Sequence, residues 1–336
     1  MEMPCAKSAI GTIAPGERAL HLAARGGYVE IVRLLLKRSR ADPNATDNGG
    51  LTPLLVTCGS QYECVEVVGL LLEAGADPAL ADKDGCVPLH LAALNDDLDL
   101  VDMLHTRAPA ALNRYASNGQ TPLFVACHEG HESMVSKLLS LGAMQRSPLE
   151  DSTTCPLAVA VFKGFVGVVR VLINEGGIQA VGGEEALTEA VGVAVQHRHA
   201  RILRLLLAVD GYERRAWWAN IQFDGRPLLH HASGFCHPAE VSVLLEAGAD
   251  EAARDPKGNT PGDIAGIDVG WEKGIRRNRG SGVAIHQMLQ RGPAYRARSW
   301  AWPSDEEADA GGSGDGDTAA DAAVLSSPLA VPKLLD

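Results

Sequence analysis

Two short stretches of the chain carry side chains that could bind a metal ion. His197 and His199 lie in one predicted loop, and Cys236 and His237 lie in a second. Imidazole and thiolate groups are the ligands that structural zinc sites use. The spacing of these residues matches no zinc-finger pattern, and both loops are expected to face solvent. Ordinary polar loop residues are therefore the alternative, and we predict that the chain holds no metal and no other cofactor.

Signatures of catalysis are absent from the sequence. It contains no G-x-x-x-x-G-K-[ST] phosphate loop, no G-x-S-x-G nucleophile turn and no H-E-x-x-H metal motif. The stretch "GGSGDGD" at Gly311 is glycine-rich, but it follows an acidic run with no predicted strand beside it, which is typical of a flexible linker. We therefore predict that the protein is not an enzyme.

The elements that must position these side chains recur with a nearly constant period. One position in each repeat serves as an anchor, and successive anchors are separated by 34, 35, 34, 34, 34, 38 and 33 residues. The anchors are Ala19, Pro53, Pro88, Pro122, Pro156, Ala190, Leu228 and Pro261. Because a lone copy could not bury its own apolar faces, this regularity predicts a stack of eight similar repeats.

Each repeat shows the same order of signals. A turn such as "DG" at Asp84 or "NG" at Asn118 comes shortly before the anchor. A threonine, as at Thr52 and Thr121, then caps a first helix that begins with proline. A second helix such as "IVRLLL" or "VVGLLL" follows, with apolar residues at helical spacing. Each repeat is therefore predicted to be a turn followed by two helices.

These repeats resemble the ankyrin repeat, whose signature is T-P-L-H-x-A followed by a glycine and a V-V-x-L-L helix. The match is clearest in "ALHLAA" at Ala19, "LTPLLVT" at Leu51 and "PLHLAA" at Pro88. The resemblance implies an all-α solenoid of about eight helix-turn-helix repeats, with β-turn fingers along one edge. It also implies that the motif histidines bond the threonine and the neighbouring backbone. The structural motif residues are Thr52, Pro53, Pro88, His90, Thr121, Pro122, His21 and His230.

Three repeats depart from the signature. Cys155 and Glu189 occupy the threonine position of the fifth and sixth repeats, and the sixth lacks a clear Asp-Gly turn. Because their first helices lack a good cap, we expect these two repeats to be the least stable part of the stack. The eighth repeat is interrupted by "IDVGWEKGIRRNRGSG" from Ile267, which is typical of a repeat that caps the end of a stack.

The longest spacing, between the sixth and seventh anchors, contains candidates for partner binding. The segment 210–225 combines four aromatic residues with Arg214 and Arg215. Aromatic residues with arginine neighbours often anchor protein interfaces. The alternative is that the two tryptophans pack inward and cover the widened junction between repeats. The four candidates are Tyr212, Trp217, Trp218 and Phe223.

The resemblance supplies a second group of candidates. In ankyrin stacks the residues six and seven places after each anchor point into a concave groove. These positions hold Arg25, Leu94, Asn95, His128, Glu129, Phe162, Lys163, Gln196, His197 and Phe235. An aromatic side chain is unexpected on a face that is merely solvated. Partner contacts are predicted for Arg25, His128, Phe162, Lys163 and Phe235.

The net charge of −12 is unevenly placed along the chain. From Pro303 onward eight acidic residues face only Lys333, a net of −7, which leaves −5 for the rest. A body this close to balance has no global basic field for nucleic acid, and the acidic tail would compete with the basic run "RRNR" at Arg276. The tail itself is expected to be disordered. It either folds back over the basic segment or only solubilises the chain.

Three parts are predicted along the chain: an N-terminal extension (residues 1–10), an ankyrin repeat domain (11–292) and an acidic disordered tail (293–336). Seven cysteines without paired short spacings suggest reduced thiols, and Cys58 and Cys127 take places that hold alanine in other repeats. No apolar run is long enough to span a membrane. The chain is therefore predicted to be intracellular, in cytoplasm or nucleus, without membrane insertion.

The predicted function is a monomeric, non-enzymatic scaffold that binds one or more partner proteins through the fingers and the groove. The alternative is a substrate-recognition adaptor for a ubiquitin ligase or a similar machine. Such an adaptor would need a helical docking segment after the repeats, and "SPLAVPKLLD" at Ser327 is short and contains two prolines. No nucleic-acid partner is predicted.

Overall fold

The computed structural model describes residues 16–60, 65–144, 155–180, 183–209, 212–265 and 279–291. The predicted N-terminal extension and acidic tail, with residues 267–278 of the interruption in the eighth repeat, lie outside these residues. The chain divides into two compact units, Met1–Leu187 (unit 1) and Thr188–Asp336 (unit 2). Each unit is described by itself.

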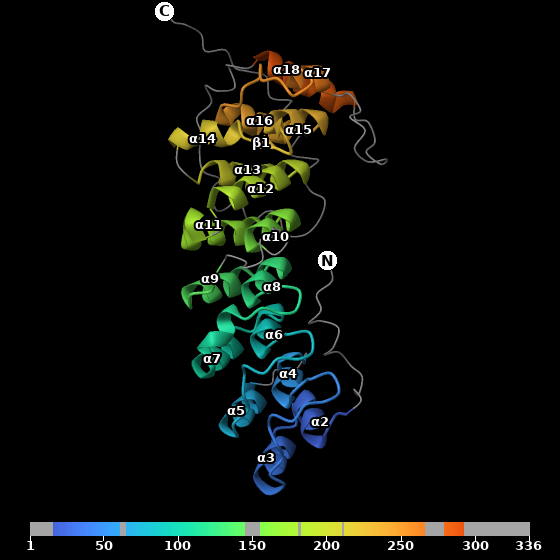
Figure 1. The fold of residues 1–336 in the computed structure, drawn as a ribbon, viewed down its shortest axis with the longest axis vertical. Helices are drawn as coiled ribbons and strands as arrows, with labels where there is room; N and C mark the ends of the chain where they lie inside the picture. Colours follow the sequence, from blue (N-terminus) through green and yellow to red (C-terminus); the bar gives the residue numbers. More distant parts are fainter. Residues whose placement is uncertain are drawn as a thin grey trace, which may run out of the picture. The chain divides into compact units, whose positions relative to one another are not determined.

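Unit 1 is built from consecutive helix pairs (Figure 1). The pairs are α2 (Ala19–Arg25) with α3 (Val29–Arg38), α4 (Pro53–Cys58) with α5 (Val65–Glu73), α6 (Pro88–Leu94) with α7 (Leu98–Arg107), α8 (Pro122–Glu129) with α9 (Glu132–Ser140), and α10 (Pro156–Lys163) with α11 (Val166–Ala180). A short 3-10 helix, η1 (Pro109–Asn113), follows α7. First helices pack on first helices from α2 to α10, and second helices do likewise, as α3 on α5 and α9 on α11. The core is therefore a continuous layer between the pairs.

Local sequence signals explain where the first helices begin. The hydroxyl of Thr52 accepts a hydrogen bond from the backbone N–H of Leu55, and Thr121 does the same for Phe124. Proline follows each threonine in the first helical turn, where a missing N–H costs nothing. α10 follows Cys155 and has no side-chain cap hydrogen bond.

The turns before the first helices are joined edge to edge. The N–H of Lys83 donates to the carbonyl of Gly49 in the preceding turn, and the N–H of Ser117 donates to the carbonyl of Asp84. These bonds satisfy backbone groups that the helices cannot reach. The β-turn fingers of repeats two to four therefore form one connected edge of unit 1.

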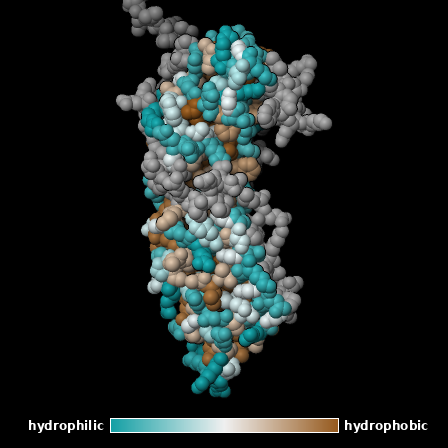
Figure 2. Space-filling model, in the orientation of Figure 1, coloured by the Kyte–Doolittle hydropathy of each residue, from teal (hydrophilic) through white to brown (hydrophobic). Residues whose placement is uncertain are grey.

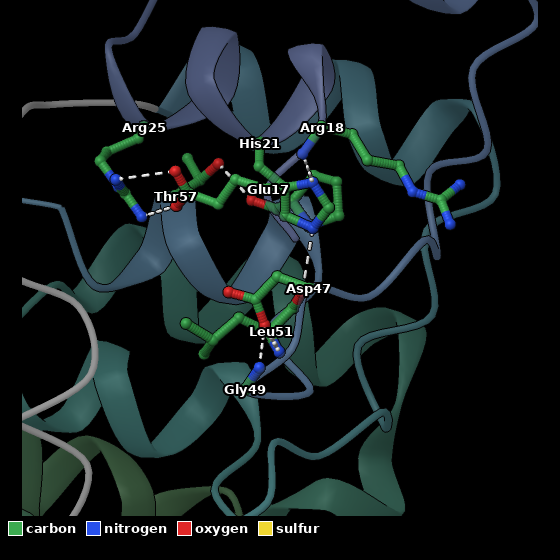
Figure 3. Close-up of polar contacts among 9 residues, drawn as sticks. Glu17, Arg18, His21, Arg25, Asp47, Gly49, Leu51 and Thr57 are labelled. Carbon is green, nitrogen blue, oxygen red and sulfur yellow. Dashed lines mark hydrogen bonds and ion pairs between the residues drawn. The ribbon is translucent and has the colours of Figure 1, made fainter. Parts of the chain in front are cut away.

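The motif histidines join neighbouring repeats. Nδ1 of His21 accepts from the backbone N–H of Arg18 at 3.2 Å, so Nε2 carries the proton and donates to the carbonyl of Leu51 at 3.0 Å (Figure 3). His90 makes the same pair of bonds, to Val87 within its own repeat and to Gln120 in the next. Each histidine thus ties the start of its own helix to the residue before the threonine of the following repeat.

Acid should destabilise the stack through His90. Burial lowers the pKa of His90 from 6.5 to about 4 in the folded protein. Because the folded pKa is the lower one, the unfolded chain takes up the proton first. The free energy of unfolding should therefore fall by up to roughly 1.4 kcal/mol per pH unit between pH 6.5 and 4, and this contribution vanishes above pH 6.5.

Urea unfolding of the wild type and of His90→Gln at pH 7 and pH 5 tests this dependence. The variant should be less stable at pH 7, because its bonds to the backbone are lost, but it should lose less stability than the wild type between the two pH values. Equal losses would show that His90 does not carry the effect.

Unit 2 continues the helix pairs and adds a hairpin. Its elements are the later part of α12 (Gly183–Gln196), α13 (Ala200–Leu207), α14 (Tyr212–Ala219), β1 (Gln222–Phe223), β2 (Arg226–Pro227), α15 (Leu228–Gly234), α16 (Pro238–Ala247), α17 (Pro261–Ile264) and α18 (Arg279–Arg291). α13, α14 and α18 pack on α16, and α15 packs on α17. The two strands are antiparallel, with Asp224 and Gly225 at positive φ in the turn between them. The predicted all-α fold is thus amended to a mostly helical one.

One element of the sixth repeat differs from the sequence prediction. Glu189 lies inside α12, which begins at Gly183, so the sixth repeat replaces its turn with added helix. The helix-forming run "EEALTEA", without a turn residue, accounts for this. Glycine ends the first helix at Gly130 and Gly164, but Asp96, Arg198 and Cys236 adopt the same left-handed conformation in other repeats. The packing of the repeats therefore imposes the loop shape even where the residue disfavours it.

The cysteines occupy three kinds of environment. Cys58 and Cys127 are free and buried, and burial raises the pKa of Cys127. Cys155 and Cys236 are free and half-buried. Cys86 differs from the expectation of reduced thiols, because it takes part in a disulfide whose partner lies outside the described residues.

Candidate protein-binding surface

The two tryptophans of α14 play different parts. Trp218 is fully buried, whereas Trp217 is 49% exposed. Their rings meet edge to face, with centroids 4.7 Å apart and an interplanar angle of 80°. The guanidinium of Arg214 lies 5.2 Å from the Trp217 ring centroid and 5.8 Å from that of Trp218. Trp218 has no exposed area with which to contact a partner, so of this pair only Trp217 remains a candidate anchor.

Asn220 fixes the end of α14 on the neighbouring repeat. Its side-chain amide donates to the carbonyl of Gly248 at 3.0 Å, and its oxygen accepts from the N–H of Asp250 at 2.7 Å. Asn44 bridges the turn after α5 in the same way. Neither asparagine belongs to the predicted repeat signature, although Asn44 and Asn220 stand nine and eight residues before an anchor. The two hydrogen bonds of Asn220, which we call the Asn220 clamp, hold the end of α14 that carries Trp217.

Phe223 is held inside unit 2. A Cβ atom placed on Gly192 would lie 2.1 Å from the Phe223 ring, so the ring occupies space that only glycine leaves open. Nε2 of His231 donates to the carbonyl of Phe223 at 2.6 Å. Phe223 is half-buried. These contacts make it a support for the hairpin.

Phe235 belongs to a line of stacked rings in the same unit. The His231 ring lies 6.2 Å from Phe235, and the Phe235 ring lies 5.6 Å from His237. Burial lowers the pKa of His231 and brings that of His237 to about 4, so both rings are neutral near pH 7. Phe235 is half-buried and keeps some area for a ligand.

The groove candidates of unit 1 differ in availability. Phe162 is 54% exposed, and Lys163 beside it is also exposed. Nδ1 of His128 lies 2.7 Å from a carboxylate oxygen of Glu129, and His128 is half-buried. Arg25 forms an ion pair with Glu17, whose side chain is fully buried (Figure 3). Phe162 and Lys163 are therefore the more accessible members of this group.

Other groove positions vary in the same way. Leu94 is half-buried, and exposed Asn95 donates to the carbonyl of Cys58 at 2.9 Å. Gln196 and His197 are exposed. Tyr212 begins α14, but its side chain is not among those that the structure describes. Figure 2 shows hydrophobic residues scattered among hydrophilic ones on this face of unit 1, which is normal for a protein surface.

The three histidines considered as metal ligands make other contacts. Nδ1 of His237 donates to the carbonyl of Val195 at 3.0 Å, and the rings of His197 and His199 stack at 6.3 Å. Among the described residues, no three His, Cys, Asp or Glu side chains gather in a way that could hold a metal ion. The strongest candidate sites that the described residues carry are the exposed aromatic side chains Phe162 in unit 1 and Trp217 in unit 2.

Stacked helix pairs, turns joined by backbone hydrogen bonds and histidines that bridge neighbouring repeats define a helical repeat protein. A family model for ankyrin repeats (three copies) matches residues 4–82 and 89–181, just over half of the chain. The chain belongs to the ankyrin repeat family. The prediction made from the repeat motifs is therefore confirmed.

Three curated relatives match part of the chain. It is 36% identical over 117 residues to "Probable 26S proteasome regulatory subunit p28" of Saccharomyces cerevisiae, covering 34% of this chain and 50% of the relative. It is 29% identical over 138 residues to human "Transient receptor potential cation channel subfamily A member 1", covering 39% and 12% respectively. It is 33% identical over 126 residues to human "BCL-6 corepressor-like protein 1", covering 37% and 7%. The chain spans half or less of the length of these relatives.

Ankyrin repeats generally mediate protein–protein interactions and are typically non-catalytic, and this holds for the class to which the chain belongs. Within the described part of the chain, no helix is both long enough and apolar enough to cross a bilayer.

Proposed function

We propose that the chain is a non-enzymatic scaffold that binds one or more partner proteins through its groove and through the surface around α14. The observation that carries this proposal is the half-exposed Trp217. Large aromatic side chains on a surface are the residues that most often dominate the energy of protein interfaces. Two residues of α14 contact the Trp217 ring. Trp218 meets it edge to face, and the guanidinium of Arg214 lies over it.

Preorganisation is the mechanism by which this surface would bind. An exposed tryptophan usually loses rotamer freedom when a partner covers it, and that loss opposes binding. The edge-to-face contact with buried Trp218 restricts Trp217 before any partner arrives. The clamp made by Asn220 restricts the helix in the same way. More of the contact energy is then left for affinity.

Unit 1 offers a second contact region in the groove. Phe162 and Lys163 combine an exposed ring with an exposed cation at the end of α10. A partner with an apolar side chain next to a carboxylate would fit these two residues. We include them in the proposed binding surface. Arg25 is already paired with Glu17, and half-buried Phe235 offers a partner only a small area.

The adaptor alternative keeps one specific argument in its favour. The yeast relative is named as a regulatory subunit of the 26S proteasome, and it shares 36% identity with a third of this chain. A chain that delivers a bound protein to a degradative machine would use the same surfaces. The two functions differ in the proteins that would bind the chain: a degradative machine would bind an adaptor as well as the protein that the adaptor delivers.

Affinity capture with the full chain tests the proposal. Proteins retained by the wild type should be lost or reduced with Trp217→Ser or Phe162→Ser, each weakening the interaction by about 2 kcal/mol. Met144→Ser, at an exposed apolar position of unit 1, is the matched control and should retain the same proteins. Retention that none of these substitutions changes would count against the proposed surface. Recovery of a ubiquitin ligase or the proteasome would favour the adaptor.

A further inference from the structure

The first helix pair of unit 1 exposes an apolar face. α2 packs against α4, and α3 packs against α5. Away from these contacts, Leu22, Ile31 and Leu34 are 40, 48 and 50% exposed. Three large aliphatic side chains of one helix pair are therefore exposed, which needs more explanation than a single exposed residue does.

The equivalent positions in later repeats are buried for Leu22 and Ile31 and half-buried for Leu34. Val56, 34 residues after Leu22, is fully buried, and so is Val67, which like Ile31 is the third residue of its second helix. Leu70, which like Leu34 is the sixth residue of that helix, is half-buried. Leu100, two repeats after Ile31, is 5% exposed. In a stack these positions pack against the helices of the preceding repeat. The face therefore has the chemistry of a helix-packing surface.

The border of this face is basic. Arg18, Lys37, Arg38 and Arg40 are exposed. The acidic residues of the same helix pair are engaged, because Glu17 is bound to Arg25 and Glu30 lies 3.5 Å from Arg33. Charge complementarity then favours a ligand with carboxylates beside its apolar residues.

We propose that the face formed by Leu22, Ile31 and Leu34 docks an amphipathic helix of a partner protein whose flanks are acidic. A helix fits because helices cover the positions of Leu22 and Ile31 in the later repeats. The apolar stripe of the helix would lie on the three aliphatic side chains, and its carboxylates would reach the basic border. This site shares no residue with the groove candidates or with α14, so it goes beyond the proposed function.

Two synthetic peptides of about five helical turns serve as probes. Both carry leucine at positions i, i+3, i+4 and i+7, and the remaining positions are mainly glutamate in one and lysine in the other. Fluorescence anisotropy with the full chain should show saturable binding of the glutamate peptide, and binding of the lysine peptide at least about tenfold weaker. Added salt should weaken the glutamate peptide. Equal affinities for the two peptides would overturn the proposal.

Substitutions locate the binding on the chain. Ile31→Ser with Leu34→Ser should weaken the glutamate peptide about tenfold, and Lys37→Glu with Arg38→Glu should reverse the preference between the peptides. Met144→Ser is the control and should change neither affinity. Circular dichroism and thermal unfolding verify that each variant is folded. Unchanged binding by the Ile31 and Leu34 variant would contradict the proposal.

Other occupants give different results, and each would overturn the proposal. A dimer in light scattering that Leu34→Glu dissociates would assign the face to a second copy of the chain. Peptide binding that appears only after removal of residues 303–336 would assign it to the tail. Sedimentation with phosphatidylserine vesicles that depends on Leu34, without peptide binding, would assign it to a membrane surface.

Discussion

Replacing Trp218 with alanine should lower the free energy of unfolding by about 3–5 kcal/mol, whereas replacing Trp217 should change it by less than about 1 kcal/mol. The two residues are neighbours in α14, but only Trp218 is fully buried. Truncating a buried indole removes its transfer energy and leaves a cavity that the stack fills only in part. Urea unfolding of the two single variants at constant pH measures the difference.

Partner binding should respond in the opposite order. Trp217→Ala should weaken capture of a partner while helical circular dichroism and the unfolding midpoint remain near those of the wild type. If Trp217→Ala instead destabilised the chain as much as Trp218→Ala and left partner capture intact, both tryptophans would be packing residues. That outcome would remove the main support for a binding surface on α14.

Leu172→Ala should lower the free energy of unfolding by about 2–5 kcal/mol. Leu172 is fully buried in α11, which packs against α9 and α10. Met144→Ala, at an exposed position in the same unit, is the matched control and should change stability by less than about 0.5 kcal/mol. Denaturant unfolding followed by circular dichroism compares the two variants.

The position of Leu172 in a linear array adds a second expected result. Each repeat contacts mainly its neighbours, so a lesion in the fifth repeat should loosen α10 and α11 more than α4 and α6. α10 lacks the threonine cap that begins α4 and α8, so hydrogen exchange in the wild type should be faster in α10 than in these two helices. Stronger protection of α10 than of α4 and α8 would show that the missing cap does not limit stability.

The sequence by itself determined the repeat and the starts of most helices. Thr52 and Thr121 cap helices as predicted because a cap is a local interaction between a side chain and the backbone three residues on. The prediction of paired helices in ankyrin repeats is confirmed by the family match and the mostly helical fold. The proposed contact residues remain predictions. Glu189 shows the limit, because its place inside α12 depended on helix propensity over a longer segment.

The tertiary structure alone decided which residues are accessible. Trp217 and Trp218 are chemically alike and adjacent, and the packing of α14 on α13 and α16 buries one of them and leaves the other at the surface. Phe223 became a packing residue because Gly192, 31 positions earlier, leaves room for its ring. Ile31 is 48% exposed, whereas Val67, at the same place in the next second helix, is buried. The burial of a side chain depends on which other side chains pack against it, and these neighbours often come from distant parts of the sequence.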